Sequence, residues 1–498
     1  MSPQPEFRVL DTENVLITTT PDGDGAPAAA CAVPLTFFDV KWLHLPPVER
    51  VLLYRLQPDA DAAAIVASLK SSLSHALRAF FPLAGRVRLI AAPGGTGGRI
   101  RHELFYQPGD GVPFTTAEYD ADVDDLAGAA DGDGVPVAAV APLAPPLPAG
   151  RAVLAVQATT LLRRRGIALG VTIHHSACDG RSSTRFLHTW ASAAAAAATG
   201  GSKHLMPAAK VIDDPPVIDA DRKLVTDPRG LYHTYLNAMP PIARSPDLEF
   251  VRSKQPSPGG DDVAVATFTL SAEALQGVRS AVAREAARRG EALSPRCSPL
   301  VAAYGLMWWC HVHAVKKQSA SNNNDYYFLF SVDQRARLKP APLPDRYFGN
   351  CMCPAIATVP RDEMAVSVSD DGGDAVATIG GLYAACAAVA AAIEEEAGEN
   401  AQEEGRWDGC VARVKRAVAN GTLSVAGSPR FRVYGLDFGF GRPVKVHMVS
   451  VAKAGAVAVA DARAGGRGLE LGVALPPDAM GRFRGCFAKA MDACLIRE

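Results

Sequence analysis

The sequence has almost no net charge, because 51 Lys and Arg residues stand against 52 Asp and Glu residues in 498. This balance excludes a strong overall field for nucleic acid or an anionic membrane, so a local basic cluster must bind any anionic ligand. The opening MSPQPEFRVL lacks a basic start followed by an apolar run, so we expect no secretory leader. The apolar stretch AACAAVAAAI at 384–393 is too short and too alanine-rich to span a bilayer. We expect a soluble cytoplasmic protein without nucleic-acid or membrane partners.

Paired cysteines are lacking as well. The ten cysteines are scattered, and the close pair Cys351 and Cys353 fits neither a CxxC pair nor a usual zinc ligand set. We therefore expect reduced thiols and no metal site.

Several common catalytic motifs are absent. The chain contains no phosphate loop G-x-x-x-x-G-K-[ST], no zinc helix H-E-x-x-H and no nucleophile elbow G-x-S-x-G. GLDFGFGRP at 435–443 is glycine-rich, but it lacks the G-x-G-x-x-G order and precedes a strand-like segment. RRRG at 163–166 has no accompanying aromatic residues, so we interpret it as a hairpin turn rather than a nucleic-acid patch.

The length of the chain predicts two or three domains. Residues 199–230 are rich in Gly, Pro and Asp and have weak periodicity, which indicates a long crossover. We therefore divide the chain into an N-terminal domain at 1–200, a linker at 201–230 and a C-terminal domain at 231–498. Strands and helices interleave in both halves, which predicts two α/β sandwiches. The expected strands lie at 50–56, 151–162, 263–270, 326–332, 431–437 and 444–451, and the expected helices at 61–81, 272–289, 298–315 and 377–397.

VTIHHSACDG at 171–180 is the most informative stretch. Residues 167–173 alternate between large apolar and small or polar side chains, which predicts a strand, and the alternation places His175 on the apolar side. Asp179 or a following serine can cap the helix predicted next. His175 would then lie at a strand-to-helix junction that can present an imidazole to a cleft. Two structural histidines and a capping Asp179 are the alternative, which the local pattern leaves open.

Five sequence blocks resemble one family. HHSACDG resembles the HxxxDG motif of the plant BAHD acyltransferases, which use acyl-CoA thioesters, and DFGFG at 437–441 resembles their DFGWG motif. VDQRARLKPAPLPDRYFGNC at 332–351 resembles a third block, whose YFGNC ending is typical of the anthocyanin and flavonoid glucoside acyltransferases. VPLTFFDVKWL at 33–43 and SLSHALRAFFPLAGRVR at 72–88 fit the same branch. The blocks occur in the family's order and span nearly the whole chain.

The resemblance implies two chloramphenicol-acetyltransferase-like domains, each a mixed sheet flanked by helices, with a channel between them. Acyl-CoA would be a co-substrate rather than a permanent cofactor, the acceptor a phenolic or flavonoid glucoside, and the protein a monomer. His175 would be the general base that removes the acceptor's hydroxyl proton. Direct transfer needs no nucleophilic cysteine, so we interpret Cys178 as a small buried residue.

The resemblance also suggests structural roles for two aspartates. Asp179 would pair with Arg335 or Arg337 and point away from the channel, although its position alone does not exclude a His–Asp dyad. Asp437 would anchor its loop together with Gly439 and Gly441. Phe440 stands where the family usually has Trp and lacks the indole N–H, which puts any hydrogen-bonding role there in doubt.

Substrate-binding candidates also come from the resemblance, and each has an ordinary surface or packing role as its alternative. The CoA candidates are Ser298, Arg335, Arg337, Ser428 and Arg430, and the candidates near the acyl and acceptor end are Thr36 and Asp39.

The donor is predicted from Arg181, which could bind a malonyl carboxylate bidentately or merely cover the start of the helix. This favours a malonyl donor over a neutral one. The alternatives are a hydroxycinnamoyl-CoA-dependent O- or N-acyltransferase of another specialised metabolite, a non-catalytic relative and a CoA-ester hydrolase.

Overall fold

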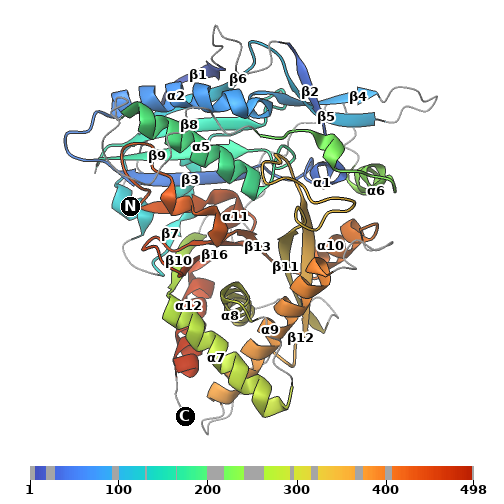
Figure 1. Ribbon diagram of the computed structural model, residues 1–498. Coiled ribbons are helices and arrows are strands. Elements are labelled where there is room, and N and C mark those ends of the chain that lie inside the picture. Colours follow the sequence, from blue (N-terminus) through green and yellow to red (C-terminus); the bar gives the residue numbers. More distant parts are fainter. Residues whose placement is uncertain are drawn as a thin grey trace.

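The computed structural model describes most of the chain. The described residues are 6–17, 29–91, 100–128, 132–163, 165–198, 218–240, 263–291, 297–315, 324–364, 374–398 and 407–495. Part of the expected linker, at 201–217, lies outside them. Within the described residues the longer strands form two large mixed sheets, and three further strands form a small one (Figure 1).

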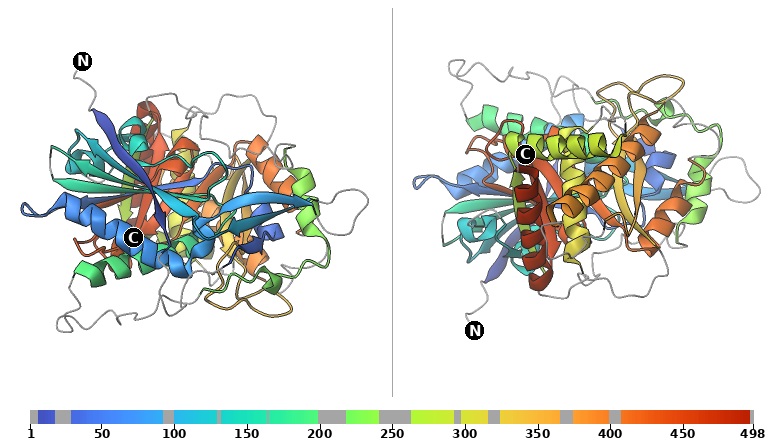
Figure 2. Two further views of the ribbon diagram at one scale, coloured as in Figure 1. Left: turned by 90° about the horizontal axis from the view of Figure 1, so that it is seen from above. Right: turned by 90° about the horizontal axis from the view of Figure 1, so that it is seen from below.

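The first sheet has six strands in the order β1-β6-β8-β9-β3-β14. Their bounds are β1 Phe7–Leu16, β6 Gly111–Tyr119, β8 Leu154–Leu161, β9 Gly166–Ile173, β3 Val48–Arg55 and β14 Lys445–Met448. β6 and β8 are parallel and the other neighbours antiparallel. Helices α2 (Ala62–Ala79) and α5 (Gly180–Ala198) pack against each other and share a core with this sheet (Figures 1 and 2).

The second sheet has seven strands in the order β12-β11-β13-β15-β16-β10-β7. Their bounds are β12 Met352–Pro360, β11 Asp325–Asp333, β13 Leu423–Gly427, β15 Val457–Asp461, β16 Leu469–Leu475, β10 Ala264–Leu270 and β7 Val135–Pro136. Four long helices form its core on one face: α7 Ala272–Arg289, α8 Pro299–Ala314, α9 Asp374–Ala397 and α12 Pro477–Leu495. The α/β prediction for both halves is confirmed.

The remaining elements are short. The small sheet has the order β2-β5-β4, with β2 Cys31–Pro34, β5 Ile100–Tyr106 and β4 Arg86–Ala91. The short α-helices are α1 Phe37–Val40, α3 Val123–Ala127, α4 Val137–Val140, α6 Leu231–Ala238, α10 Cys410–Ala419 and α11 Val449–Lys453. Single 3-10 turns lie at Phe81–Ala84, Ala141–Leu143, Arg222–Leu224, Pro429–Phe431 and Val433–Gly435.

The two halves exchange strands. β14, from the last quarter of the chain, pairs with β3 in the first sheet, and β7, from the N-terminal half, pairs with β10 in the second. Each half therefore completes the other's sheet, and the region where the sheets meet is built from both ends of the sequence (Figure 1).

Local sequence explains where the long helices begin. Asp61 caps α2 by accepting hydrogen bonds from the amides of Ala63 and Ala64, and Ser271 and Ser298 cap α7 and α8 in the same way. α8 is apolar on almost every side because α7, α9 and α12 surround it.

Helix α9 confirms the helix expected at 377–397 and begins three residues earlier, at Asp374. Within the described residues, its segment Ala377–Ala397 is long and apolar enough to cross a membrane, and half of that segment is buried. It packs against α7, α8 and α12 in the second core. A core helix therefore accounts for the same length and hydropathy.

Two of the predicted strands are wrong or too long. The segment 431–437 is not a strand, because two 3-10 turns, Pro429–Phe431 and Val433–Gly435, occupy most of it. Arg432 between the two turns has a left-handed conformation with φ 50°, which breaks a strand. The segment 444–451 is a strand only to Met448, and α11 starts at Val449.

Strand β9 is buried on both faces rather than on one. The small residues of its second face allow the segment 141–145 to pack directly on the strand. Thr172 donates a hydrogen bond to the carbonyl of Pro145 at 2.6 Å, and a Cβ on Gly170 would lie 1.9 Å from the carbonyl oxygen of Leu143. The position of the strand that leads into His175 therefore depends on this close backbone approach.

Gly170→Ala should destabilise the protein by about 1–3 kcal/mol or more, because the added methyl group meets backbone that cannot move aside easily. Thermal unfolding followed by circular dichroism would measure this loss. Gly472→Ala on β16 is the matched control, since its Cβ would make an ordinary 3.4 Å contact with Ala458. Equal melting temperatures for the two variants would contradict the prediction.

Candidate active site

The two adjacent histidines lie in the turn between β9, which ends at Ile173, and α5, which begins at Gly180. His174 is fully buried, its Nδ1 lies 2.7 Å from the hydroxyl oxygen of Ser176, and burial lowers its pKa to about 3. His174 is therefore a neutral structural residue. His175 is only half-buried and can meet a ligand.

The ring of His175 is held by two neighbours. The indole of Trp42 stacks on it with 3.7 Å between ring centroids and 8° between planes. Nδ1 lies 3.1 Å from the amide oxygen Oδ1 of Asn350. Among the described residues, Nε2 has no hydrogen-bond partner.

The hydrogen bonds of Asn350 determine which nitrogen of His175 carries the proton. The amide nitrogen Nδ2 of Asn350 donates to Oδ1 of Asp39 at 2.9 Å and to the backbone oxygen of His175 at 2.9 Å. Both partners can only accept at neutral pH, so the nitrogen side of the amide must face them. Oδ1 therefore faces the ring and accepts a hydrogen bond from the N–H at Nδ1. The proton stays on Nδ1, which leaves the Nε2 lone pair available as a base.

Asp39, the first residue of this chain of contacts, is fully buried and pairs with Arg222 at 3.2 Å between Oδ2 and Nε. Thr36 donates to Oδ2 of Asp39 from its amide at 2.8 Å and from its hydroxyl at 2.7 Å. Thr36 and Asp39 were expected near the acyl and acceptor end. In the structure Thr36 contacts Asp39, and Asp39 contacts Arg222 and reaches His175 through Asn350.

The pKa of His175 is lowered from its ordinary value of 6.5, mainly because burial penalises the charged imidazolium. The charge of Asp179 and the hydrogen bond to Asn350 act in the opposite direction without reversing the shift. A neutral imidazole at physiological pH follows, which is the form that can accept a proton.

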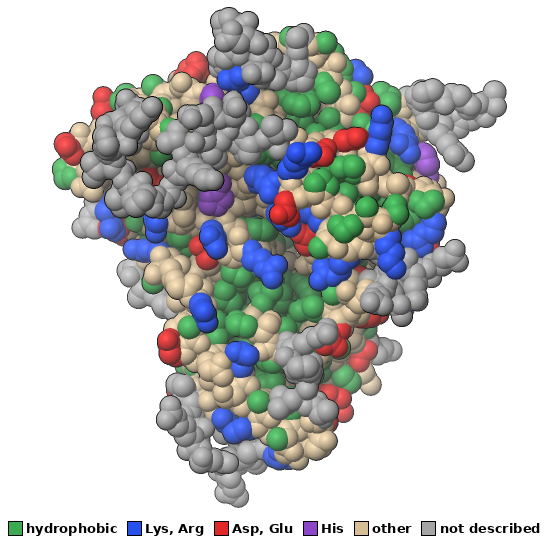
Figure 3. Space-filling model, in the orientation of Figure 1, with side chains coloured by type: hydrophobic (Ala, Val, Ile, Leu, Met, Phe, Trp, Pro, Cys, Tyr) green, Lys and Arg blue, Asp and Glu red, His purple; other side chains and the backbone are tan. Residues whose placement is uncertain are grey.

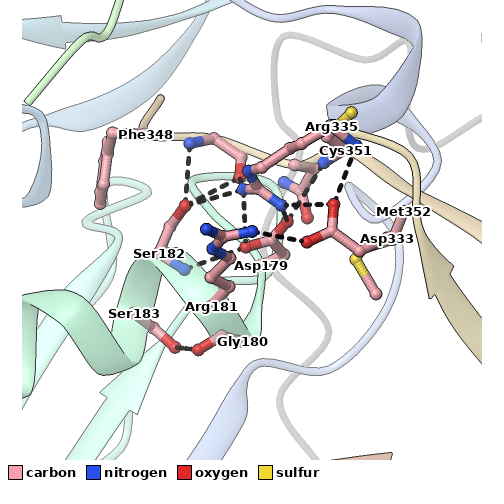
Figure 4. A network of polar contacts seen from close by, with 12 residues as sticks. Asp179, Gly180, Arg181, Ser182, Ser183, Asp333, Arg335, Phe348, Cys351 and Met352 are labelled. Carbon is pink, nitrogen blue, oxygen red and sulfur yellow. Dashed lines mark hydrogen bonds and ion pairs between the residues drawn. The ribbon is translucent and has the colours of Figure 1, made fainter. Parts of the chain in front are cut away.

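Asp179 contacts Arg335 rather than the ring of His175 (Figure 4). Its two oxygens lie 2.8 and 3.1 Å from the guanidinium, and they accept the backbone amides of Ser182 at 3.0 Å and Cys351 at 3.2 Å. Burial would raise the pKa of Asp179, but Arg335 and these amides hold it below its usual value. Asp179 caps α5 and joins the motif loop to the segment after β11.

The other arginines of this region have different partners. Arg337 donates to the carbonyls of Asp333 and Ala397 and is not the partner of Asp179. Arg181 pairs with Asp333 at 3.1 Å (Figure 4) and with Asp345 at 2.9 Å. Two carboxylates thus already contact Arg181 at the surface, and its binding of an acyl carboxylate stays a prediction. Arg335 is buried against Asp179, which leaves it unable to serve as a phosphate ligand as well.

The DFGFG loop is closed by one carboxylate. Oδ1 of Asp437 accepts the amides of Gly439 at 2.8 Å and Gly441 at 3.0 Å, and both glycines have positive φ values. A Cβ on Gly439 would lie 2.8 Å from the Cβ of Ala198, so the loop packs closely on α5. Phe440 packs edge-on against Tyr54 at 4.9 Å, where no indole N–H is needed.

The remaining candidates are placed individually. Ser298 caps α8, and Ser428 caps the 3-10 turn Pro429–Phe431 by accepting the amide of Arg430. Arg430 itself is exposed. Ser428 also lines a cavity between the two sheets. Ser298 does not line that cavity, and its hydrogen bond to α8 gives it a capping role.

Neither the cysteines nor the possible metal-binding side chains of the described residues form another catalytic site. All ten cysteines are free, and burial raises the pKa of Cys178 far above its ordinary value of 9.0, which keeps it a thiol. No group of His, Cys, Asp and Glu in the described residues could hold a metal ion.

Sequence reasoning missed three residues of the site: Asn350, Trp42 and Arg222. Asn350 lies inside the YFGNC block and Trp42 inside the VPLTFFDVKWL block. A polar amide or a large aromatic residue within such a block was the available signal for a role in the site. Arg222 lies in the expected linker, and its sequence neighbourhood gives no sign of a buried partner.

Comparisons with known proteins match nearly the whole chain. A sequence profile described as the Transferase family matches residues 27–489. Malonyl-CoA:anthocyanidin 5-O-glucoside-6''-O-malonyltransferase of Arabidopsis thaliana is 30% identical over 463 residues, covering 92% of this chain and 94% of that protein. Phenolic glucoside malonyltransferase 1 of the same plant is 31% identical over 495 residues, 94% of each.

A relative with another donor and a solved structure also match. Coumaroyl-CoA:anthocyanidin 3-O-glucoside-6''-O-coumaroyltransferase 2 of Arabidopsis thaliana is 27% identical and covers 97% of this chain and 98% of that protein. The crystal structure of vinorine synthase superimposes with a TM-score of 0.62 over 96% of both chains at 19% identity, which shows the shared fold. The chain belongs to the Transferase family and is an acyltransferase of the BAHD type.

Proposed function

We propose that the protein transfers a malonyl group from malonyl-CoA to a hydroxyl of a phenolic or flavonoid glucoside, with His175 as general base. The observation that carries the proposal is the half-buried, neutral imidazole whose Nδ1 donates to Asn350 and whose Nε2 is available. The two malonyltransferases described above support the donor and the acceptor class.

The reaction needs a base but no covalent enzyme intermediate, because a thioester is already an activated acyl group. The acceptor's hydroxyl oxygen attacks the thioester carbonyl carbon while Nε2 of His175 takes the hydroxyl proton. The tetrahedral intermediate then collapses, the carbon–sulfur bond breaks, and the proton on Nε2 passes to the leaving sulfur to give free CoA and the ester. His175 returns to its neutral form.

Asn350 is a positioning residue in this scheme. Its amide oxygen selects the tautomer of His175, and its amide nitrogen is held by the buried carboxylate of Asp39. Trp42 restricts the tilt of the ring from one side. Together these contacts keep the Nε2 lone pair pointing in one direction without competing for it.

The surface between the two halves suits an anionic cofactor-like substrate. In Figure 3, Lys and Arg side chains surround an apolar area in the middle of the face, where the first-sheet half meets the second-sheet half. CoA combines phosphates with a largely apolar pantetheine arm, so basic groups around an apolar surface suit both parts.

A hydroxycinnamoyl donor is the second candidate, because a coumaroyltransferase is among the relatives. A hydrolase would share this fold but release CoA without an acceptor, and a non-catalytic relative would share it and release no CoA.

The purified protein should form an acyl-glucoside and free CoA from malonyl-CoA and a phenolic glucoside, and little CoA without the acceptor. Products can be followed by liquid chromatography with mass spectrometry, with acetyl- and coumaroyl-CoA as competing donors. His175→Ala should lower turnover by about 10²–10⁴-fold, because it removes the base. Faster use of coumaroyl-CoA, or CoA release that is independent of acceptor, would refute the malonyl transfer.

Asn350→Ala should lower kcat by about tenfold or more with little change in the KM for acyl-CoA, because a mispositioned base affects the transition state. The hydrogen bond to Asn350 raises the pKa of His175, so its loss should move the acid limb of the pH–kcat profile to lower pH. Comparing that profile with the profile of the wild type measures this shift. An unchanged acid limb would argue for a purely structural role of Asn350.

Asp179→Asn should lower the free energy of unfolding by about 3 kcal/mol or more, because buried Arg335 loses its counter-charge. The melting temperature should fall accordingly. The melting temperature, measured by differential scanning calorimetry, and the turnover should fall together. Asp345→Asn is the matched control, since the Asp345 side chain is 91% exposed and its ion pair is with the surface residue Arg181. A normal melting temperature with a large loss of turnover would instead favour a His–Asp dyad.

A further inference from the structure

A small, partly open cavity of about 50 Å³ lies where the two sheets meet. Its walls come from β3, β14 and α11 on one side and from β10, β15 and β16 on the other. The strand exchange described above therefore creates this space, and neither half forms it alone.

Small side chains keep the cavity open. On β15 and β16, one face carries large apolar residues that belong to the second core, whereas the other face carries mostly small residues that line the cavity. The small residues on the cavity face are Ala458, Ala460, Gly472 and Ala474. The alternation in VAVAD and LELGVAL thus separates a packed core from a vacant volume.

The cavity adjoins the motif loop of His175. The ring of Phe431 lines the cavity and packs on Gly180, where an added Cβ would lie 2.7 Å from two ring atoms. Arg50, on β3, also lines the cavity and lies opposite Val171 of β9, one pleat before that strand ends at Ile173. Its charge is close enough to affect Cys178, three residues after His175.

Within the described residues, Arg50 is a buried cation without an acidic partner. It is 5% exposed, and its Nε contacts the sulfur of Met448 at 3.3 Å. None of the described carboxylates forms an ion pair with it. The neighbouring carboxylates are engaged elsewhere, since Glu49 pairs with Lys453 at 2.6 Å and Glu470 accepts the hydroxyl of Tyr434 at 2.6 Å.

Such an arrangement is costly unless an anion completes it. Burial lowers the pKa of Arg50 to about 10, so the guanidinium stays protonated at neutral pH although little around it stabilises the charge. A carboxylate in the cavity would gain a charge-assisted bidentate contact, whereas a neutral group would gain none.

We infer that Arg50 binds the free carboxylate of a dicarboxylic acyl group, and that the cavity is the acyl-donor pocket. This inference rests on the proposed transfer of malonyl and assigns the selection of the donor to a buried residue instead of Arg181. The pocket places the carboxylate end between the sheets and the thioester end toward the loop of His175. An anion of CoA itself is the other source of the same chemistry, and the comparison of donors below distinguishes them.

The test measures binding as well as turnover. In the His175→Ala background, which limits turnover, isothermal titration with malonyl-CoA and acetyl-CoA gives the preference for the carboxylate. Arg50→Gln and Arg50→Met should reduce the malonyl-over-acetyl affinity ratio by at least about tenfold and leave acetyl-CoA binding nearly unchanged. The same ratio in kcat/KM, measured with His175 present, should fall in parallel.

Arg55→Gln is the matched control, because Arg55 lies on the same strand but is exposed and pairs with Asp124. It should keep the wild-type ratio. Arg50→Met should fold, since its apolar side chain replaces a lone buried charge beside Met448. Melting temperatures of all variants verify this.

The outcomes separate the two proposals. An unchanged malonyl-over-acetyl ratio in both Arg50 variants overturns the inference, even if the wild type transfers malonyl. Equal weakening of both donors also overturns it, because Arg50 would then bind an anion of CoA. An Arg50-dependent preference for malonyl-CoA without transfer to any glucoside would support the inference and refute the proposed function.

Discussion

Two adjacent backbone amides, those of Asn350 and Cys351, donate to two different buried carboxylates, Asp39 at 3.1 Å and Asp179 at 3.2 Å. The geometry of the site depends on this double attachment. Asp39 comes from the first helical turn of the chain and Asp179 from the loop after β9, so the segment that carries Asn350 is held from two directions. The imidazole of His175 is thereby oriented by a residue 175 positions further along the sequence.

Buried ion pairs are a demanding way to make this connection. Asp39 with Arg222 and Asp179 with Arg335 each take two charges out of water, and an apolar contact of equal volume would give comparable stability. Directionality is what the charges add, because a carboxylate accepts several hydrogen bonds at defined angles. Each aspartate uses that capacity to hold an arginine and one of two neighbouring amides. The position of Asn350 follows from both.

The sequence predicted the elements better than the contacts between them. Alternation placed β9 and the turn of His175 correctly, because both depend on neighbours in the sequence. Resemblance supplied two candidate partners for Asp179, and only the fold distinguishes Arg335 from Arg337. Asn350 escaped detection as an orienting residue because its partners lie far away in the chain. The expected strand at 431–437 failed because a single left-handed residue in it outweighs its apolar pattern.

The difference between Arg181 and Arg50 shows why sequence position is a weak guide to binding. Arg181 lies two residues from the motif aspartate, yet Asp333 and Asp345 already occupy its guanidinium and water screens it. Arg50 lies more than a hundred residues earlier, but sheet pairing brings it beside the same loop and strand exchange encloses it. An arginine can discriminate between ligands when its charge is desolvated and not yet compensated. By that criterion, Arg50 in the cavity between the sheets meets the conditions for selecting an acyl carboxylate better than Arg181 at the start of α5, which is the basis of the proposal made above.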